Sequence, residues 1–147
     1  MQTALVFVCL LFAMAGQAAS PSMSGTWKLD RDLTTADLSW NKTSVIVINQ
    51  SDEEVRFEYF DDDRRRLGTE AFVTDGRERP RYTTRLERAY ARARWKENKL
   101  VVTTRSFLDI YGYQSYSSED RWELSADGKT LSNKSSDGKV TVFYQIE

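Results

Sequence analysis

Histidine is absent from the 147-residue sequence, and the single cysteine, Cys9, lies close to the N-terminus. Beyond residue 9 the chain therefore has neither a disulfide framework nor a histidine-ligated metal site. The most common general base of enzymes is missing too, and no serine stands in a nucleophile-elbow context. The sequence predicts no catalytic residue, no metal and no cofactor. Carboxylates far apart in sequence remain the only candidates for acid–base chemistry.

An excess of charge of either sign is also missing. The 21 basic and 22 acidic side chains leave a formal net charge of −1, which argues against a nucleic-acid partner and an anionic membrane surface. One stretch is rich in arginine, but glutamates dilute it, and we interpret it as a solvated sheet face: Arg77, Arg79, Arg81, Arg85, Arg88, Arg92 and Arg94. The run Asp61 to Arg66 has three carboxylates, which are possible calcium ligands, but it lacks the alternate spacing and the glycine of a calcium loop. We therefore interpret it as an exposed loop whose charges neutralise one another.

Residues 1–19 carry no charged side chain and are apolar from Ala4 to Ala15. This pattern predicts a secretory signal peptide, with the mature protein beginning near Ser20 or Pro21. The apolar run is too short to span a bilayer comfortably, so we expect no stable membrane anchor. Residues 20–147 then form a single domain. We expect the protein to be exported, to a periplasm or to the medium.

From residue 23 onward, apolar and polar residues alternate with period two between closely spaced turn residues, which predicts a meander of about eight to ten strands. The alternation sets four hairpin registers. Turns at Glu97–Asn98 and Asp127–Gly128 pair Trp95 with Leu100, Ala93 with Val102, Ala91 with Thr104, Leu124 with Leu131, and Trp122 with Asn133. Turns at Ser51–Asp52 and Asp137–Gly138 pair Ile48 with Val55, Ile46 with Phe57, Ser135 with Val140, and Leu131 with Tyr144.

The middle of the chain has weaker signals. We expect a short strand in the segment TEAFVTDG, residues 69–76, and a break between strands near Glu87–Arg88. The long segments without strand character are residues 31–42, 61–68 and 109–118.

Two motifs carry a family resemblance. The segment SGTWKLD, residues 24–30, places a Gly-x-Trp on the first strand, and RWELSADGKTL spans residues 121–131. Together they resemble the lipocalin and fatty-acid-binding (calycin) families, and more closely a group of small exported bacterial lipocalin-like proteins. The resemblance implies an all-β, antiparallel up-and-down β-barrel with Trp27 packed across its closed end. The last strand has no Arg-x-Tyr pair, so a fatty-acid ligand is not implied.

The expected registers distinguish the two ends of such a barrel. Bulky residues gather near one set of turns and predict a closed end: Trp95, Leu100, Leu124, Leu131 and Tyr144. Smaller and more polar residues gather near the other, together with a tyrosine-rich loop. Ligand sites are concave, with mostly apolar and aromatic linings and a few polar groups. The candidate ligand-binding residues are therefore Tyr59, Ala91, Thr104, Tyr111, Tyr113, Trp122 and Asn133.

Three functions remain open at this point. The first is non-catalytic binding of a small, partly apolar molecule by an exported protein. The second is a protein-interaction or envelope-structural module with an outer Arg/Tyr face, because side chains alone can fill so small a barrel. The third and least favoured is a hydrolase or isomerase that uses carboxylates.

Overall fold

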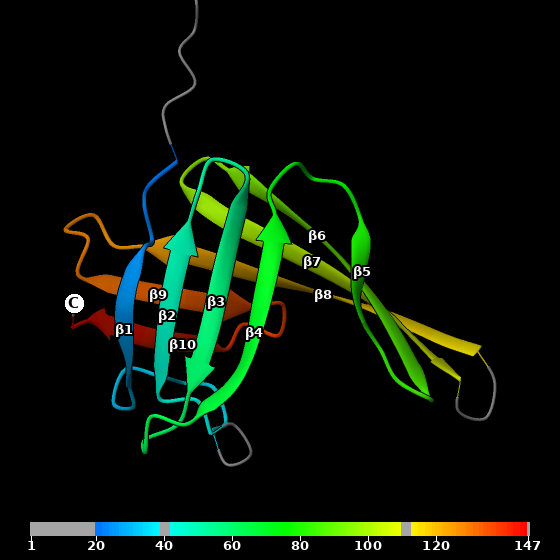
Figure 1. Cartoon of the computed structure of the whole chain (residues 1–147), viewed down its shortest axis with the longest axis horizontal. Coiled ribbons are helices and arrows are strands. Elements are labelled where there is room, and N and C mark those ends of the chain that lie inside the picture. The colour runs from blue at the N-terminus through cyan, green and yellow to red at the C-terminus, as the bar shows by residue number, and fades with distance from the viewer. Residues whose placement is uncertain (1–19, 39–41, 110–112, 147) are drawn as a thin grey trace, which may run out of the picture.

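The computed structural model describes residues 20–38, 42–109 and 113–146, and in these ranges the chain forms ten strands and no helix. The strands are β1 (Gly25–Asp30), β2 (Val45–Gln50), β3 (Glu54–Phe60), β4 (Arg66–Val73), β5 (Arg79–Thr83), β6 (Glu87–Lys96), β7 (Lys99–Asp109), β8 (Tyr113–Leu124), β9 (Thr130–Ser135) and β10 (Val140–Gln145). They build one curled sheet (Figure 1). The predicted all-β, up-and-down barrel class is confirmed.

The strand order is β4-β3-β2-β1-β10-β9-β8-β7-β6-β5, and every pair is antiparallel. The first and last strands pair with each other, so the two sheet edges belong to β4 and β5. The segment between these edge strands contacts β6 through a bridge between Asp75 and Arg94, and the Gly76 amide donates to the Ala93 carbonyl at 2.9 Å. The barrel therefore has a seam between β4 and β5. The far ends of β5–β8 extend beyond the other strands (Figure 1).

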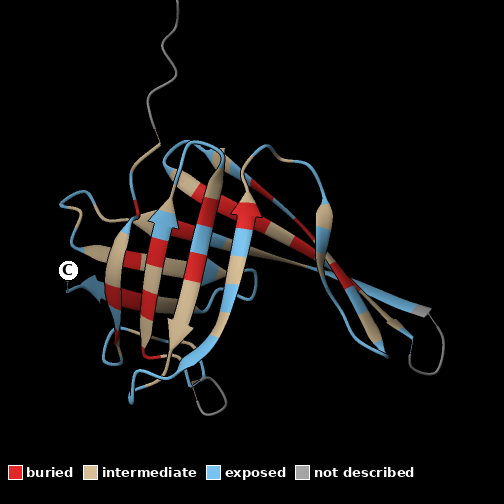
Figure 2. Ribbon diagram, in the orientation of Figure 1, coloured by how far each residue is buried: buried red, intermediate tan, exposed pale blue. Residues whose placement is uncertain are grey.

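The core lies on the concave face of the sheet. Buried residues alternate with exposed ones along the strands, as expected for a sheet with one solvated face (Figure 2). The most deeply buried large side chains include Trp27, Phe57, Ile46, Ile48 and Leu100. Burial of such side chains contributes about 1.5–3 kcal/mol each relative to exposure.

Two of the predicted registers are confirmed. In the β6–β7 hairpin, Trp95 lies opposite Leu100 and Ala93 opposite Val102. In the β8–β9 hairpin, Leu124 lies opposite Leu131. The second hairpin has a longer turn than a two-residue Asp-Gly loop, since Ser125 donates its amide to the Thr130 carbonyl. Its centre still falls between Asp127 and Gly128, so the pairing is unchanged.

The predicted β2–β3 register is wrong by two residues. Ile48 lies opposite Phe57, and Ile46 opposite Tyr59. The turn is centred one residue later than predicted, because Ser51 exchanges backbone and side-chain hydrogen bonds with Glu54. A shift by two leaves every side chain on its predicted face.

The predicted β9–β10 register is wrong by one residue, which reverses the faces of β10. Val140 lies opposite Lys134, and Phe143 opposite Leu131. Gly138 adopts a left-handed φ of 85° and closes a three-residue loop in which the Ser135 amide donates to the Lys139 carbonyl. Phe143 is therefore buried, whereas Tyr144 is 39% exposed and does not belong to the closed end.

Strands occupy more of the middle of the chain than predicted. The turn between β5 and β6 spans Thr84 to Glu87, with the Thr84 amide donating to the Glu87 carbonyl, rather than lying at Glu87–Arg88. Strand β4 begins at Arg66, inside the segment predicted to be a loop. Most of residues 109–118 are strand as well, because β7 ends at Asp109 and β8 starts at Tyr113.

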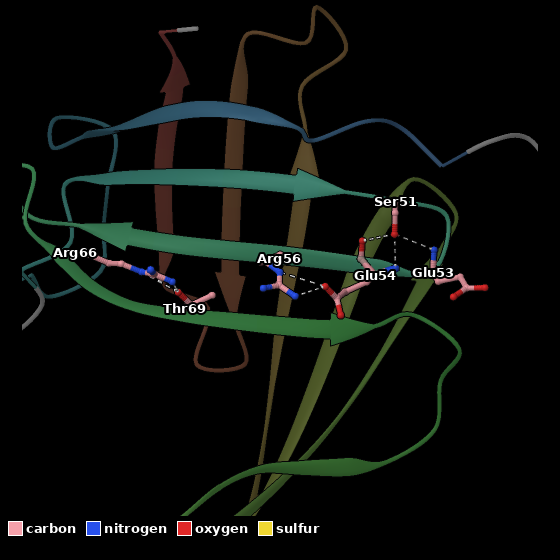
Figure 3. A network of polar contacts seen from close by, with 6 residues as sticks. All are labelled: Ser51, Glu53, Glu54, Arg56, Arg66 and Thr69. Carbon is pink, nitrogen blue, oxygen red and sulfur yellow. Dashed lines mark hydrogen bonds and ion pairs between the residues drawn. The ribbon is translucent and has the colours of Figure 1, made fainter.

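The convex face carries charged side chains that pair locally. On β3, Arg56 donates to the carboxylate of Glu54, and on β4, Arg66 donates to the hydroxyl of Thr69 (Figure 3). Arg92 and Arg94 on β6 are exposed, as expected for a solvated sheet face. Exposed pairs of this kind typically contribute less than about 1 kcal/mol each.

Candidate functional site

One part of the inner wall is apolar and closely packed. Trp27 is 1% exposed, and its indole Nε1 donates to the Met23 carbonyl at 2.9 Å. Leu100 and Leu131, both predicted for the closed end, are completely buried. The other two large side chains predicted there, Trp95 and Leu124, are half-buried and pack against this core. Apolar side chains fill this part of the inner wall.

A second part of the inner wall carries a polar network that joins strands β3, β4, β5 and β7. The Tyr59 hydroxyl donates to Glu70 Oε2 at 3.0 Å. Arg81 donates from Nε to Glu70 Oε1 at 2.7 Å and from Nη1 to Thr104 Oγ1 at 2.7 Å. The Arg81 guanidinium also lies 5.5 Å from the centre of the Phe72 ring. We call Tyr59, Glu70, Arg81 and Thr104 the inner network.

The inner network crosses the seam of the barrel. Glu70 belongs to edge strand β4 and Arg81 to edge strand β5, which share no backbone ladder. Arg81 lies where the β5–β6 pairing shifts, between Pro80 and Tyr82. This bulge turns Arg81 toward the inner wall, whereas the sequence predicted a solvated face for it. A side-chain ion pair thus joins the two edges.

The phenol of Tyr59 remains protonated at ordinary pH. Burial raises the pKa of Tyr59 far above its usual value, and the neighbouring negative charge of Glu70 raises it further. The Arg81 guanidinium acts in the opposite direction on the Tyr59 pKa but is outweighed. Tyr59 therefore acts as a hydrogen-bond donor in the inner network.

A further carboxylate, Asp120 on β8, faces the inner network. Its backbone lies opposite Val102 of β7 and Ser135 of β9. Burial raises the pKa of Asp120, and Glu70 adds to the rise, while the positive charge of Arg81 opposes it. Within the described ranges, the Asp120 carboxylate has no hydrogen bond or ion pair. It is thus a half-buried acid without a direct partner.

A pocket of about 150 Å³ lies at the seam. Its lining combines an aromatic ring, two small side chains and the charged pair: Phe72, Ala91, Ala93, Glu70 and Arg81. The rest of the wall comes from β4, the β4–β5 connection and β5: Thr69, Ala71, Val73, Arg77, Arg79 and Pro80. A cavity of this size accommodates a group about as large as benzene.

A second polar cluster lies on the extension formed by β5–β8. Tyr82 and Tyr116 both donate hydrogen bonds to Oε1 of Glu87, at 2.7 and 2.6 Å. These hydrogen bonds, together with one from Ser106, lower the pKa of Glu87. The two tyrosines are 41% and 49% exposed, so this cluster faces solvent.

The candidate ligand-binding residues lie in several surroundings. Tyr59 and Thr104 belong to the inner network, and Ala91 lines the pocket. Trp122 is buried, with its ring centre 4.8 Å from that of Phe57 and 6.2 Å from that of Phe143. Asn133 is half-buried opposite Trp122. Tyr113 begins β8, although its side chain lies outside the description, and Tyr111 lies outside the described residues. Their role in binding stays a prediction.

Sequence patterns missed Glu70, Arg81 and Asp120. Glu70 and Phe72 are two residues apart on β4, so the alternation could have placed Glu70 on the inner face. Asp120 is likewise two residues from Trp122, which the β8–β9 register already placed inside. Arg81 had no such signal, because a bulge in β5 changes the period.

Among the described residues, no three histidine, cysteine, aspartate or glutamate side chains form a group that could hold a metal ion. Within the described ranges there is no helix that is long and apolar enough to cross a bilayer.

Comparison with known proteins identifies the fold. No family model matches the sequence, and no curated protein matches it. Two solved structures of the fluorescent protein UnaG are similar, one of the wild type and one of a single-residue variant. Each is 16% identical, with a TM-score of 0.58. The alignments cover 85% of this chain and 97% of the wild type or 96% of the variant. With its ten-stranded curled sheet and this likeness, the chain has a calycin-type fold.

Proposed function

We propose that this protein binds a small, partly apolar molecule inside the barrel and does so without catalysis. The observation that carries the proposal is the pocket at the seam, where Phe72, Ala91 and Ala93 adjoin the charged pair of Glu70 and Arg81. Apolar surface with a few fixed polar groups is the usual composition of a ligand site. The calycin-type fold supports the same function, since small barrels can enclose one ligand.

The size of the pocket limits what enters it. About 150 Å³ suits a single aromatic ring or a short branched chain, whereas drug-sized ligands occupy about 300–1,000 Å³. The proposed ligand therefore places one ring-sized apolar group against Phe72, Ala91 and Ala93. Binding without catalysis is supported by the engagement of Glu70 and Arg81 with each other and by the absence of histidine.

The binding test uses phenethyl alcohol, a neutral ring-sized probe, in a calorimetric titration of residues 20–147. Saturable binding to the wild type is expected. Ala91→Leu should weaken it at least tenfold, because the added carbons fill the pocket. Ala126→Leu makes the same change in an exposed turn and should have no effect. Absence of binding to the wild type, or equal binding by Ala91→Leu, would contradict the proposal.

The stability of Ala91→Leu distinguishes a barrel with a ligand pocket from a barrel that is filled by its own side chains. Overpacking a solid core costs about 1–3 kcal/mol, whereas filling a pre-existing pocket costs little. We expect Ala91→Leu to unfold within about 0.5 kcal/mol of the wild type in urea. A large loss of stability without ligand binding would favour the filled barrel and an interaction role.

We also propose that the domain is exported, on the basis of the uncharged apolar leader at residues 1–19. Expression of the full chain in a secretion-competent host, followed by mass spectrometry of the exported fraction, tests this. The mature protein should begin near Ser20 or Pro21. Recovery of an exported chain that retains Met1 would contradict cleavage.

A further inference from the structure

The lining of the seam pocket carries more positive than negative charge. Among the described residues that line it, three are arginines: Arg77 belongs to the β4–β5 connection, and Arg79 and Arg81 belong to β5. Glu70 of β4 contributes the carboxylate of the lining. The excess is local, because the whole chain has a formal net charge of −1. A pocket with this lining attracts a molecule that carries a negative group.

Two of the three arginines already have carboxylate partners. Arg81 pairs with Glu70 across the seam. Arg79 donates from Nη1 and Nη2 to the two carboxylate oxygens of Asp75, at 2.6 and 2.7 Å. The hydrogen bond from Arg79 holds the pKa of Asp75 below its usual value, so Asp75 is ionised at neutral pH and balances the charge of Arg79. A negative group on a ligand would have to displace Glu70 or Asp75 to reach either arginine.

The charge of Arg77 is the one left over. Its Nε lies 3.8 Å from Oδ2 of Asp75, an oxygen to which Arg79 already donates. Within the described ranges the Arg77 guanidinium makes no hydrogen bond, and its side chain is 83% exposed. The neighbouring Glu78 is engaged elsewhere, since it accepts from Arg105 at 2.5 Å. The planar guanidinium of Arg77 therefore retains donors that match a carboxylate.

The pocket and Arg77 suit opposite ends of one small molecule. Phe72, Ala91 and Ala93 offer an apolar wall to a ring, whereas Arg77 lies on the β4–β5 connection, which spans the seam (Figure 1). Because Arg77 is exposed, a carboxylate beside it keeps part of its hydration and avoids most of the desolvation cost of a buried ion pair. About 150 Å³ holds a ring but no long alkyl chain.

We infer that the ligand is a small aromatic acid, whose ring enters the seam pocket and whose carboxylate pairs with Arg77 at the exposed margin of the pocket. This inference rests on the proposed function and names the chemical class of its ligand. The apolar wall supplies most of the affinity, and Arg77 determines the preference for a negative charge.

Three probes that share a phenyl ring and differ in their polar end provide the test: phenylacetate, phenethyl alcohol and phenethylamine. Calorimetry on residues 20–147 at pH 7 and low salt should show phenylacetate binding about fivefold more tightly than the alcohol, as expected of a partly exposed ion pair, and the amine more weakly than either. In about 0.5 M NaCl the preference should fall below twofold, because salt screens exposed charges.

Two arginine variants show whether Arg77 itself is responsible. Arg77→Gln should make phenylacetate and the alcohol bind equally, while affinity for the alcohol changes less than twofold. Arg65→Gln is the matched control, since Arg65 is also exposed, lies 3.7 Å from the carboxylate two residues before it, and does not line the pocket. This variant should keep the preference.

The possible outcomes separate the two proposals. If the alcohol binds but phenylacetate binds no more tightly, the aromatic acid is wrong and the binding function stands. Retention of the preference in Arg77→Gln, or an equal loss of it in Arg65→Gln, would overturn the role of Arg77. If none of the three probes binds, the binding function itself fails.

Discussion

The apolar and polar parts of the inner wall are held together in different ways. Around Trp27, Leu100 and Leu131, each side chain is stabilised by many small contacts that have little directional preference. In the inner network, stability depends on a few hydrogen bonds between charged groups at fixed positions. Apolar packing tolerates a change of shape better than a charge. A buried polar network stabilises the fold only while each of its members keeps a hydrogen-bond partner.

The largest expected effect comes from placing a charge in the apolar part. Val102 is 2% exposed on the inner face of β7, so Val102→Asp should destabilise the protein by about 3 kcal/mol or more. Val101 is 5% exposed but lies on the outer face, opposite Arg94 and Arg121. Val101→Asp should cost less than half as much, because these arginines can pair with the new carboxylate. Urea unfolding of both variants measures the difference, and equal losses would contradict it.

An intermediate effect is expected from removing one partner of the inner network. Glu70→Gln leaves the Arg81 charge without its ion-pair partner and Tyr59 with a weaker acceptor. The Arg81 and Glu70 side chains are about a quarter exposed, so we expect a loss of about 2 kcal/mol, below the 3–5 kcal/mol of fully buried pairs. The double variant Glu70→Gln with Arg81→Met should regain part of this loss. Adding Arg81→Met alone completes the cycle, and a double variant whose loss equals the sum of the two single losses would show that the pair is not coupled.

The smallest effect concerns Asp120 and depends on pH. Its pKa is raised in the folded protein, so folding favours the protonated acid. The stabilising contribution is complete below the unfolded pKa of about 3.9 and is lost as pH rises through the folded pKa. Asp120→Asn should therefore be more stable than the wild type at pH 7.

Thermal unfolding at several pH values measures this difference. The advantage of Asp120→Asn should shrink as pH falls toward 3.9 and disappear below it, because both proteins are then neutral at this position. The groups that face Asp120 and contribute to its pKa are Arg81 and Glu70, with smaller effects of Asp137 and Glu119. A difference that is constant with pH would indicate a packing effect instead of a charge effect.

The fold was largely predictable because alternation alone determines which face of a strand is buried. Pairing of Ala93 with Val102 follows from that alternation, since a slip by one residue would expose the apolar set. The β9–β10 pairing failed because the backbone of Gly138, rather than any side-chain pattern, determines the length of its loop. An odd shift of this kind changes which aromatic residue of β10 enters the core.

The site was less predictable for a different reason. The position of Arg81 depends on a bulge, and its partner Glu70 is eleven residues away in sequence but on the other side of the seam. Hairpin registers constrain neighbouring strands and carry no information about two edges that do not pair. Of the side chains predicted from registers, Thr104 therefore belongs to the inner network and Ala91 lines the adjoining pocket, while the two charged members of the network were missed.

The seam also affects how copies of this chain meet in concentrated solution. An unpaired edge strand exposes backbone groups on which a foreign strand can add, and this is a common route to aggregation. Strand β5 is five residues long, contains Pro80, which has no amide hydrogen, and is interrupted by the shift between Pro80 and Tyr82. Beyond β4, the chain is held at Thr74 by the Glu53 carbonyl and at Gly76 by the Ala93 carbonyl. The bulge that directs Arg81 inward thus also makes β5 a poor template for self-association.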